Sequence, residues 1–456
     1  MLTLAMLACV LPMNASSPRL VPQEPSKAAV TLPKYPVAAL AAAVDLPTHQ
    51  LRAAAAVELA KRSVPLAQWL EAATSLPLRK SASERFDDDT VRYVAELAVM
   101  GSSSKGEILV RTPPGEHEGR WPVLFCWHPA GGRGADSLRM WATLADRYGL
   151  LLVAPTEAYE PYRKQGWSYH PDGYERVQEA LRFVRRHYDV DEDRIMLAGL
   201  RGGGHMAWDV GIRFADQFAA ILPANGSTRL GTPFRDSNMA YLESIANVSV
   251  RSMHWGQLED AQVNNVNRSI EVLRQFGAKN ANHLEHVSQL DALNPSLPGW
   301  GAFFASKRTV PKLLVKFPDR AWTPHRREFG RHHWLDALEY DRRVRVPFPP
   351  KVSAAKGRKL DELGRLAYLD QYLRDMLPRI EASMTAPGLF AVKDRHITSF
   401  RLLLSQDMIG KQQTVVVRWR GRTIRQRATP SAEIFLREFV ERFDRTFLPV
   451  VEVRVK

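Results

Sequence analysis

The chain has 456 residues, of which 45% are hydrophobic and 25% charged, so it is long enough for two or three folded domains and too apolar for wholesale disorder. The formal net charge of +14 raises the question of nucleic-acid binding. Basic residues are nevertheless interleaved with acidic ones along the whole chain, and there is neither a long Lys/Arg block nor a recognisable nucleic-acid module. The composition predicts a globular protein without a nucleic-acid role.

Residues 1–17, MLTLAMLACVLPMNASS, have the apolar core and small-residue end of a secretory signal peptide, although a charged n-region is missing. They predict a secreted or periplasmic protein; a cytoplasmic protein is the alternative if the start is misassigned. Once such a leader is removed, Cys126 is the only cysteine left, which excludes an intrachain disulfide. No other segment reaches the ~20 apolar residues of a membrane span.

Residues 18–90 form a proline-rich linker followed by a helical segment. Five prolines between positions 18 and 36 predict an extended linker. From 37 to 75 the Ala- and Leu-rich sequence predicts two or three helices, including LRAAAAVELAKR and LAQWLEAATSL. Packing is the expected role of these helices, and no function is assigned to them.

Strand and helix signals alternate from Val91 to about residue 345. VRYVAELAV and GEILVRTPP predict a hairpin. The segments that follow alternate between strand and helix: WPVLFCWHP, DSLRMWATLADRYG, LLLVAPTE, YERVQEALRFVRRHYDV, RIMLAGL, GGHMAWDVGIRFADQF, FAAILPANG, VRSMHWGQ, a helix near 266–277, and LLVKFPD. An antiparallel pair followed by βαβ units predicts an α/β fold, with a mostly parallel sheet between two layers of helices. Residues 280–311 interrupt this alternation and predict an insertion before the last strand, either part of a cap or a surface loop.

Residues 346–456 have a different character and predict a small β-rich module, of a common domain size. Proline-rich RVRVPFPPKV closes the preceding unit. FRLLLSQ, TVVVRWR and GRTIRQR are candidate strands, the last two meeting at Arg420-Gly421 in a predicted hairpin. A helix, SAEIFLREFVERF, and a strand, VVEVRV, end the chain.

The segment AGLRGGGHMAWDV (198–210) combines a strand end, a glycine-rich turn and a helix start. With WHPAGG (127–132), GWSYHPDG (166–173) and the preceding DVDEDRIML, it makes residues 91–341 resemble the α/β-hydrolase superfamily. The resemblance is to the branch of secreted esterases and peptidase-like hydrolases that includes dienelactone hydrolase and polyhydroxyalkanoate depolymerase relatives. It implies a nucleophile elbow of the form G-x-S-x-G, with arginine in place of the serine at Arg201.

The predicted elbow has the small residues that its backbone needs and lacks the serine hydroxyl that its chemistry needs. Gly199 and Gly203 meet the demand for small residues two positions either side of the nucleophile. Arg201 cannot replace serine, because a guanidinium stays protonated and is a poor nucleophile. Two interpretations stay open. Arg201 contacts an anion beside the backbone N–H of Gly202 and the oxyanion loop at Ala130 and Gly131, or it turns to solvent from an inactivated elbow.

The other triad positions implied by the resemblance are also altered or uncertain. Glu259, at the spacing of the family's acid, and its neighbour Asp260 are candidates to orient a histidine. After LLVKFPD the family's histidine position falls near Trp322, and His325 is the nearest candidate. His332 and His333, on an expected helix, are weaker ones.

No metal site or cofactor is predicted. Cys126, in an expected core strand, and Ser168 and Ser227, in expected loops, lack an identifiable base partner as substitute nucleophiles.

The main hypothesis is therefore a degenerate hydrolase-fold protein without serine-type hydrolysis, which binds a small acidic or ester-bearing ligand at the elbow pocket. One alternative is an active ester or peptide hydrolase with a non-standard nucleophile. The other is a structural secreted protein with a vestigial pocket.

Overall fold

The computed structural model describes residues 32–99, 102–156, 171–229, 238–256, 260–308, 313–315, 331–341 and 360–456. The predicted signal peptide and most of the linker therefore lie outside the described residues. No helix in the described ranges is long and apolar enough to cross a membrane.

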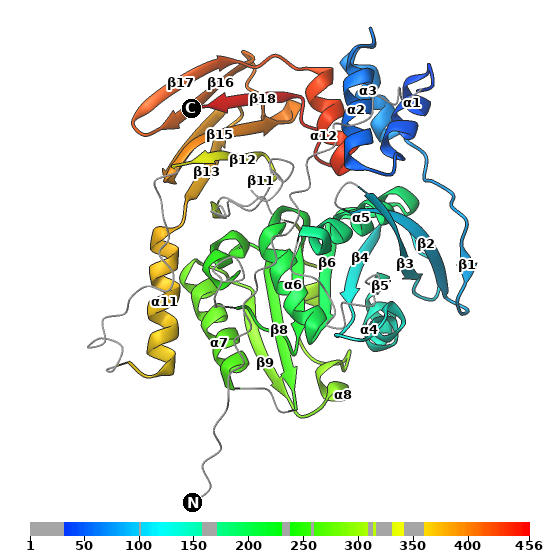
Figure 1. Cartoon of the computed structure of the whole chain (residues 1–456), viewed down its shortest axis with the longest axis vertical. Helices are drawn as coiled ribbons and strands as arrows, with labels where there is room; N and C mark the ends of the chain where they lie inside the picture. The colour runs from blue at the N-terminus through cyan, green and yellow to red at the C-terminus, as the bar shows by residue number, and fades with distance from the viewer. Residues whose placement is uncertain are drawn as a thin grey trace, which may run out of the picture. The chain divides into compact units, whose positions relative to one another are not determined.

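A nine-stranded sheet forms the centre of the first half of the structure (Figure 1). Its spatial order is β1-β2-β3-β5-β4-β6-β7-β8-β9, antiparallel from β1 to β5 and parallel from β5 to β9. The strands are β1 (Glu84–Arg85), β2 (Thr90–Val99), β3 (Ser102–Arg111), β4 (Trp121–Trp127), β5 (Leu151–Thr156), β6 (Val190–Leu200), β7 (Ala220–Ala224), β8 (Ser249–Trp255) and β9 (Ala281–His286). This confirms the predicted α/β class with its antiparallel start.

Helices cover both faces of this sheet, which explains why its central strands are nearly continuous apolar runs. Neighbouring residues of β4 point to opposite faces of the sheet. Phe125 belongs to the hydrophobic cluster on one face, with α5 and α6, and Leu124 to the cluster on the other, with α4 and α9. The helices are α4 (Gly134–Tyr148), α5 (Pro171–His187), α6 (Gly202–Arg213), α7 (Asp260–Gln275), α8 (Gln289–Ala292) and α9 (Trp300–Phe304), with 3₁₀ turns η1 (Ala215–Gln217) and η3 (Asn238–Ile245).

The C-terminal strands form two further sheets. One contains β11 (Arg331–His332), β12 (Leu335–Tyr340), β15 (Ile397–Leu404) and β18 (Val451–Val455). The other contains β10 (Leu313–Val315), β13 (Arg379–Ala386), β14 (Leu389–Arg395), β16 (Thr414–Trp419) and β17 (Arg422–Arg427). Helices α11 (Glu362–Met376) and α12 (Ala432–Arg442) and the 3₁₀ turn η5 (Gln406–Met408) accompany them. The predicted hairpin at Arg420-Gly421 is confirmed, with both residues at positive φ.

The N-terminal helices share a hydrophobic core with these C-terminal strands. They are α1 (Pro36–Val44), α2 (His49–Ala60) and α3 (Leu66–Thr74), which confirms the predicted helical segment. Trp69 of α3 and Phe435 of α12 belong to one buried cluster, and α2 lies beside α12 in Figure 1. Two ends of the chain more than 300 residues apart thus complete one core.

Three sequence predictions are wrong in this part of the chain. Residues 281–286 are not part of an insertion but form β9, the last parallel strand of the main sheet. The segment LLVKFPD contributes β10, which pairs antiparallel with β13 instead of ending the main sheet. His332 and His333 do not lie on a helix: His332 pairs with Leu335 in a tight hairpin, and His333 has φ 52° in its turn. The chain therefore passes from the main sheet to the two C-terminal sheets before residue 313, and not near residue 345.

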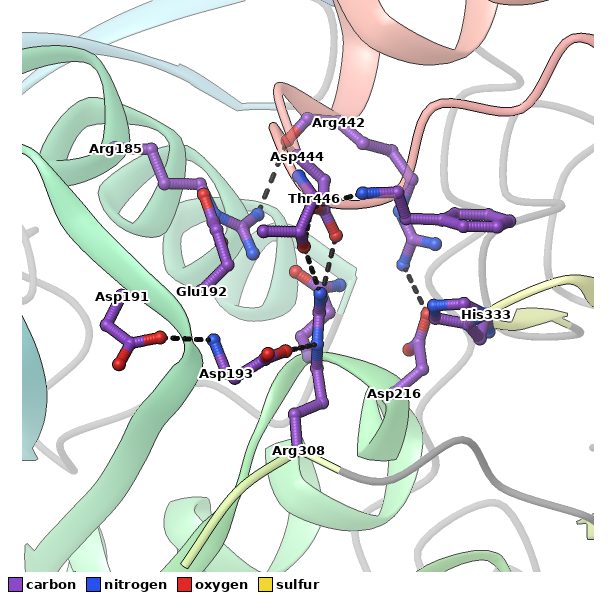
Figure 2. A network of polar contacts seen from close by, with 12 residues as sticks. Arg185, Asp191, Glu192, Asp193, Asp216, Arg308, His333, Arg442, Asp444 and Thr446 are labelled. Carbon is purple, nitrogen blue, oxygen red and sulfur yellow. Dashed lines mark hydrogen bonds and ion pairs between the residues drawn. The ribbon is translucent and has the colours of Figure 1, made fainter. Parts of the chain in front are cut away.

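Buried ion pairs connect the main sheet's elements to the C-terminal segment (Figure 2). Arg308 donates from Nη1 to Asp444 Oδ2 at 2.7 Å and from Nη2 to Thr446 Oγ1 at 2.5 Å. Arg442 of α12 donates to Asp216 of η1 at 2.9 Å. Because a buried charge is costly unless it is paired, these contacts fix α12 and the segment after it against the sheet.

The environment of Glu438 makes the free energy of unfolding depend on pH. Burial alone would raise the pKa of its carboxyl, but Arg331, Arg401 and Arg437 outweigh burial and lower this pKa to about 2. A lowered pKa stabilises the fold at pH values above the unfolded pKa, and this contribution is lost as the pH falls toward 2. We expect about 3 kcal/mol from this carboxylate to disappear between roughly pH 4.5 and 2. We expect the free energy of unfolding, measured in urea at several pH values, to fall less steeply with decreasing pH in Glu438→Gln than in the native chain. An equal pH dependence in both chains would contradict this role of Glu438.

Candidate functional site

The turn between β6 and α6 has the strained backbone of an elbow. Arg201 has φ 52° and ψ −111°, a conformation that residues other than glycine rarely adopt. Its backbone N–H donates to Ala224 O at 2.8 Å, and its carbonyl accepts from His205 N at 2.9 Å. The residue is thus held by β7 on one side and by the first turn of α6 on the other. The predicted strand-turn-helix geometry is confirmed.

Glycines make this turn sterically accessible. A Cβ on Gly199 would lie 2.1 Å from Gly203 O, and a Cβ on Gly203 would lie 2.1 Å from Trp127 O. Both contacts are with backbone atoms, so a neighbouring side chain cannot relieve them by moving. The positions two residues before and two residues after Arg201 therefore require glycine.

The predicted oxyanion loop lies against the start of α6. A Cβ on Gly202 would be 3.2 Å from Ala130 N, so the backbones of these two residues are neighbours. Gly131, next in the loop, has φ 75°, and Gly132 N donates to Pro129 O at 2.9 Å. Three features of the structure agree with one fold. They are a mostly parallel sheet with an antiparallel start, a strained turn after β6 and a glycine-containing loop after β4. The chain has the α/β-hydrolase fold.

The side chain of Arg201 is exposed at this elbow. Among the residues that the structure describes, it has neither a hydrogen bond nor an ion pair. It stands at the N-terminus of the twelve-residue helix α6, where the helix dipole favours an anion and disfavours a cation. The guanidinium is therefore available to a ligand from solvent.

Two of the substitute nucleophiles considered from the sequence are poorly placed. Cys126 is fully buried in β4, and its Sγ donates to Val153 O at 3.4 Å. Burial raises the pKa of this thiol well above its usual value, so the reactive thiolate is disfavoured. Ser227 is also buried, and its backbone N–H donates to His205 Nδ1 at 3.0 Å. Ser168 lies outside the described residues.

The remaining predicted triad residues fall largely outside the described ranges. Glu259, Trp322 and His325 lie in gaps, and Asp260 begins α7 without a described side chain. The assignment of Trp322 and His325 to the histidine position depends on LLVKFPD forming the last strand of the main sheet. Since that segment pairs with β13 instead, the reason for choosing these two residues no longer holds.

The sequence interpretation missed His286, the last residue of β9. In this fold the chain order is nucleophile, acid, histidine, and the histidine follows the last strand. His286 lies opposite Trp255 at the carboxyl edge of the sheet. Its Nε2 is shielded from solvent without a hydrogen-bond partner in the described structure, and burial lowers the pKa of its imidazole. The missed signal was the strand itself: ANHLEH has few apolar residues because β9 is an edge strand.

One histidine cluster offers metal-ligand atoms. His254, His283 and Glu285 each contribute one such atom, all within 4.8 Å of one another. His254 Nδ1 lies 2.6 Å from His283 Nε2, a hydrogen-bond distance, so these two nitrogens face each other. Burial, and then the charge of His254, lowers the pKa of His283 to about 4, which keeps this ring neutral. The cluster lies on the β8–β9 edge of the sheet, on the face opposite to that of His286.

No family model matches the chain, and no curated relative was found. Among similar solved structures, a thermostable esterase is 17% identical over 48% of this chain and 64% of its own, with a TM-score of 0.36. A fluorophosphonate-binding serine hydrolase from Staphylococcus aureus is 12% identical over 48% and 98%, with a TM-score of 0.38. 2,6-dihydroxy-pseudo-oxynicotine hydrolase is 16% identical over 60% and 84%, also at 0.38. At such values the fold assignment rests on the strand order and the elbow.

Proposed function

We propose that this chain is a non-hydrolytic protein of α/β-hydrolase fold that binds a small carboxylate ligand at its elbow. The observation that carries the proposal is Arg201 in the strained elbow conformation, φ 52° and ψ −111°, at the position of the nucleophile. Acyl transfer at this position needs a hydroxyl or thiol that a histidine can deprotonate, and a guanidinium supplies neither.

The surroundings of Arg201 favour an anion. The exposed guanidinium stands near the first turn of α6, whose dipole makes an unpaired cation unfavourable by ~0.3–1 kcal/mol. The backbones of Ala130 and Gly202 meet at the same place. A carboxylate bound here would relieve the cation and accept hydrogen bonds from the planar guanidinium fork.

Substitution of Arg201 tests this site. We expect Arg201→Ala to weaken the binding of acetate, succinate or citrate by at least about tenfold, because charge-assisted hydrogen bonds contribute ~1.5–3 kcal/mol. Calorimetric titration at constant ionic strength measures the effect. Arg147→Ala is the matched control, since this arginine is exposed in the last turn of α4. Equal carboxylate affinity of the native chain and Arg201→Ala would remove the proposal.

A second candidate function is hydrolysis with a non-standard nucleophile, and one observation favours it. His286 keeps an unpartnered Nε2 at the end of the last strand, as a general base needs before it accepts a proton. Turnover of short-chain p-nitrophenyl esters by the native chain, abolished by His286→Ala, would establish this function and exclude the non-hydrolytic one.

A further inference from the structure

A partly open, arginine-lined cavity lies away from the elbow, where three distant parts of the chain meet. It has a volume of about 360 Å³ and is lined by α2, α5, α12 and strands of the β11–β18 sheet. Phe214, directly after α6, also lines it. Arg201 precedes the first residue of this twelve-residue helix, so the helix length of about 18 Å separates the cavity from the elbow. The two are different sites.

The lining of this cavity is strongly cationic. Among the described residues it includes eight arginines and four carboxylates. Seven of these arginines have a carboxylate within ion-pair distance, some of them through acids just outside the lining. The eighth, Arg182, has no such partner among the described residues. The charges of Glu179, Glu441 and Asp45 still raise the pKa of Arg182, so these carboxylates balance part of its charge from beyond ion-pair distance.

Arg182 is 7% exposed, and its hydrogen bonds go to backbone carbonyls. Its Nη1 donates to Glu441 O at 2.6 Å, and its Nη2 donates to Val44 O. Burial, and then the charge of Arg52, lowers the pKa of this guanidinium to about 10. Carbonyl oxygens satisfy its donors without neutralising its charge, and the nearby carboxylates offset only part of the cost of burying it, since the pKa stays lowered.

Arg185, one turn further along α5, has a free donor. It is 3% exposed, lines the same cavity, and its Nη2 has no hydrogen-bond partner within the described structure. Its Nε donates to Glu192 Oε2 at 2.8 Å, and its Nη1 donates to the carbonyl of Arg442, which Figure 2 shows beside it. Burial raises the pKa of Glu192 to about 7, so near neutral pH this carboxyl only partly neutralises Arg185.

We propose that this cavity binds a small dianion of the phosphate class, held by Arg182 and Arg185. Side chains at i and i+3 of a helix are neighbours, about 5–6 Å apart at Cβ, which suits the clustered oxygens of one tetrahedral group better than two separated carboxylates. The cavity is larger than one phosphate ion, so it has room for a small organic phosphate. Its occupant would contact the N-terminal helices, the main sheet's helix α5 and the C-terminal module together.

Thermal unfolding of the full chain tests this second site. Inorganic phosphate, added at constant ionic strength with NaCl as balance, is expected to raise the Tm with the logarithm of its concentration. Arg182→Gln is expected to weaken phosphate binding at least about tenfold. Arg147→Gln, with the same change of charge on exposed α4, should keep the native response. Glycerol 3-phosphate binding more tightly than inorganic phosphate would identify an organic phosphate as the occupant, and the reverse order would identify the free ion.

Two further variants separate loss of phosphate binding from loss of folding and from binding at the elbow. Arg182→Lys retains the charge and replaces Arg182→Gln if that variant does not fold; we expect it to bind phosphate more weakly than the native chain. Phosphate should still raise the Tm of Arg201→Ala, in which any anion site at the elbow is removed, because the cavity is a different site. The proposal is overturned if the native Tm ignores phosphate, if the Arg182 variants respond fully, or if the response disappears in Arg201→Ala instead.

Discussion

Replacing Arg201 by serine is expected to create ester hydrolysis that the native chain, as proposed above, does not perform. The elbow already holds residue 201 in the nucleophile conformation, with the backbones of Ala130 and Gly202 meeting beside it. His286 lies at the carboxyl edge of the same sheet, at the end of β9 and three strands from β6, and burial lowers the pKa of its imidazole. Arg201→Ser adds the hydroxyl that acyl transfer lacks, and if His286 acts as its base we expect kcat/KM for p-nitrophenyl acetate to rise at least about a hundredfold.

Two comparisons make this result specific. Arg201→Ala removes the same positive charge without adding a hydroxyl and is expected to remain silent. Arg201→Ser combined with His286→Ala should lose the gained activity, because serine then has no base. Turnover in the single variant that survives His286→Ala would point to a different base. An Arg201→Ser chain as silent as Arg201→Ala would show that the histidine position has also decayed.

Gly203→Ala is expected to produce the largest loss of stability at the elbow. The new Cβ would lie 2.1 Å from Trp127 O and 2.8 Å from His128 O, both backbone atoms of the strand end and loop beneath α6. Relief requires α6 to move away from β4, so the cost exceeds ordinary overpacking of 1–3 kcal/mol. We expect a loss of about 3 kcal/mol or more in the free energy of unfolding, measured by urea denaturation.

Gly301→Ala is the matched control for this substitution. Gly301 lies in α9, and the nearest atom to a new Cβ is Tyr148 Cε1 at 4.0 Å, an ordinary contact. Because alanine has the higher helix propensity, this variant should be neutral or more stable by up to about 1 kcal/mol. Similar losses in both variants would mean that the close approach at Gly203 is relaxed by movements that the structure does not show.

Local sequence signals were sufficient for the parts of the site that depend on neighbouring residues. The glycines at 199 and 203 and the apolar strand before them predict the turn, because steric exclusion around an elbow involves residues close in sequence. Buried parallel strands such as β4 and β7 were equally predictable, since both faces are covered and the runs are apolar.

The last strand of the main sheet, which ends at His286, was not predictable in this way. β9 belongs to the sheet only through its pairing with β8, and as an edge strand it carries polar residues, so its sequence resembles a loop. The short apolar run at 313–315 gave the stronger strand signal, and it pairs with β13 in another sheet. Choosing between two candidate strands requires knowing their partners, which hydrophobic periodicity does not specify.

By itself, then, the sequence determined the α/β class and the glycine-rich turn with Arg201 at its centre, because each depends on local patterning. Only the tertiary structure decided that His286 ends the last strand, that the N-terminal helices and the C-terminal strands share one core, and that Arg182 and Arg185 line one cavity. Those features arise from contacts between residues far apart in sequence, and the arginines on α5 look like solvated surface charges until α2 and α12 cover them.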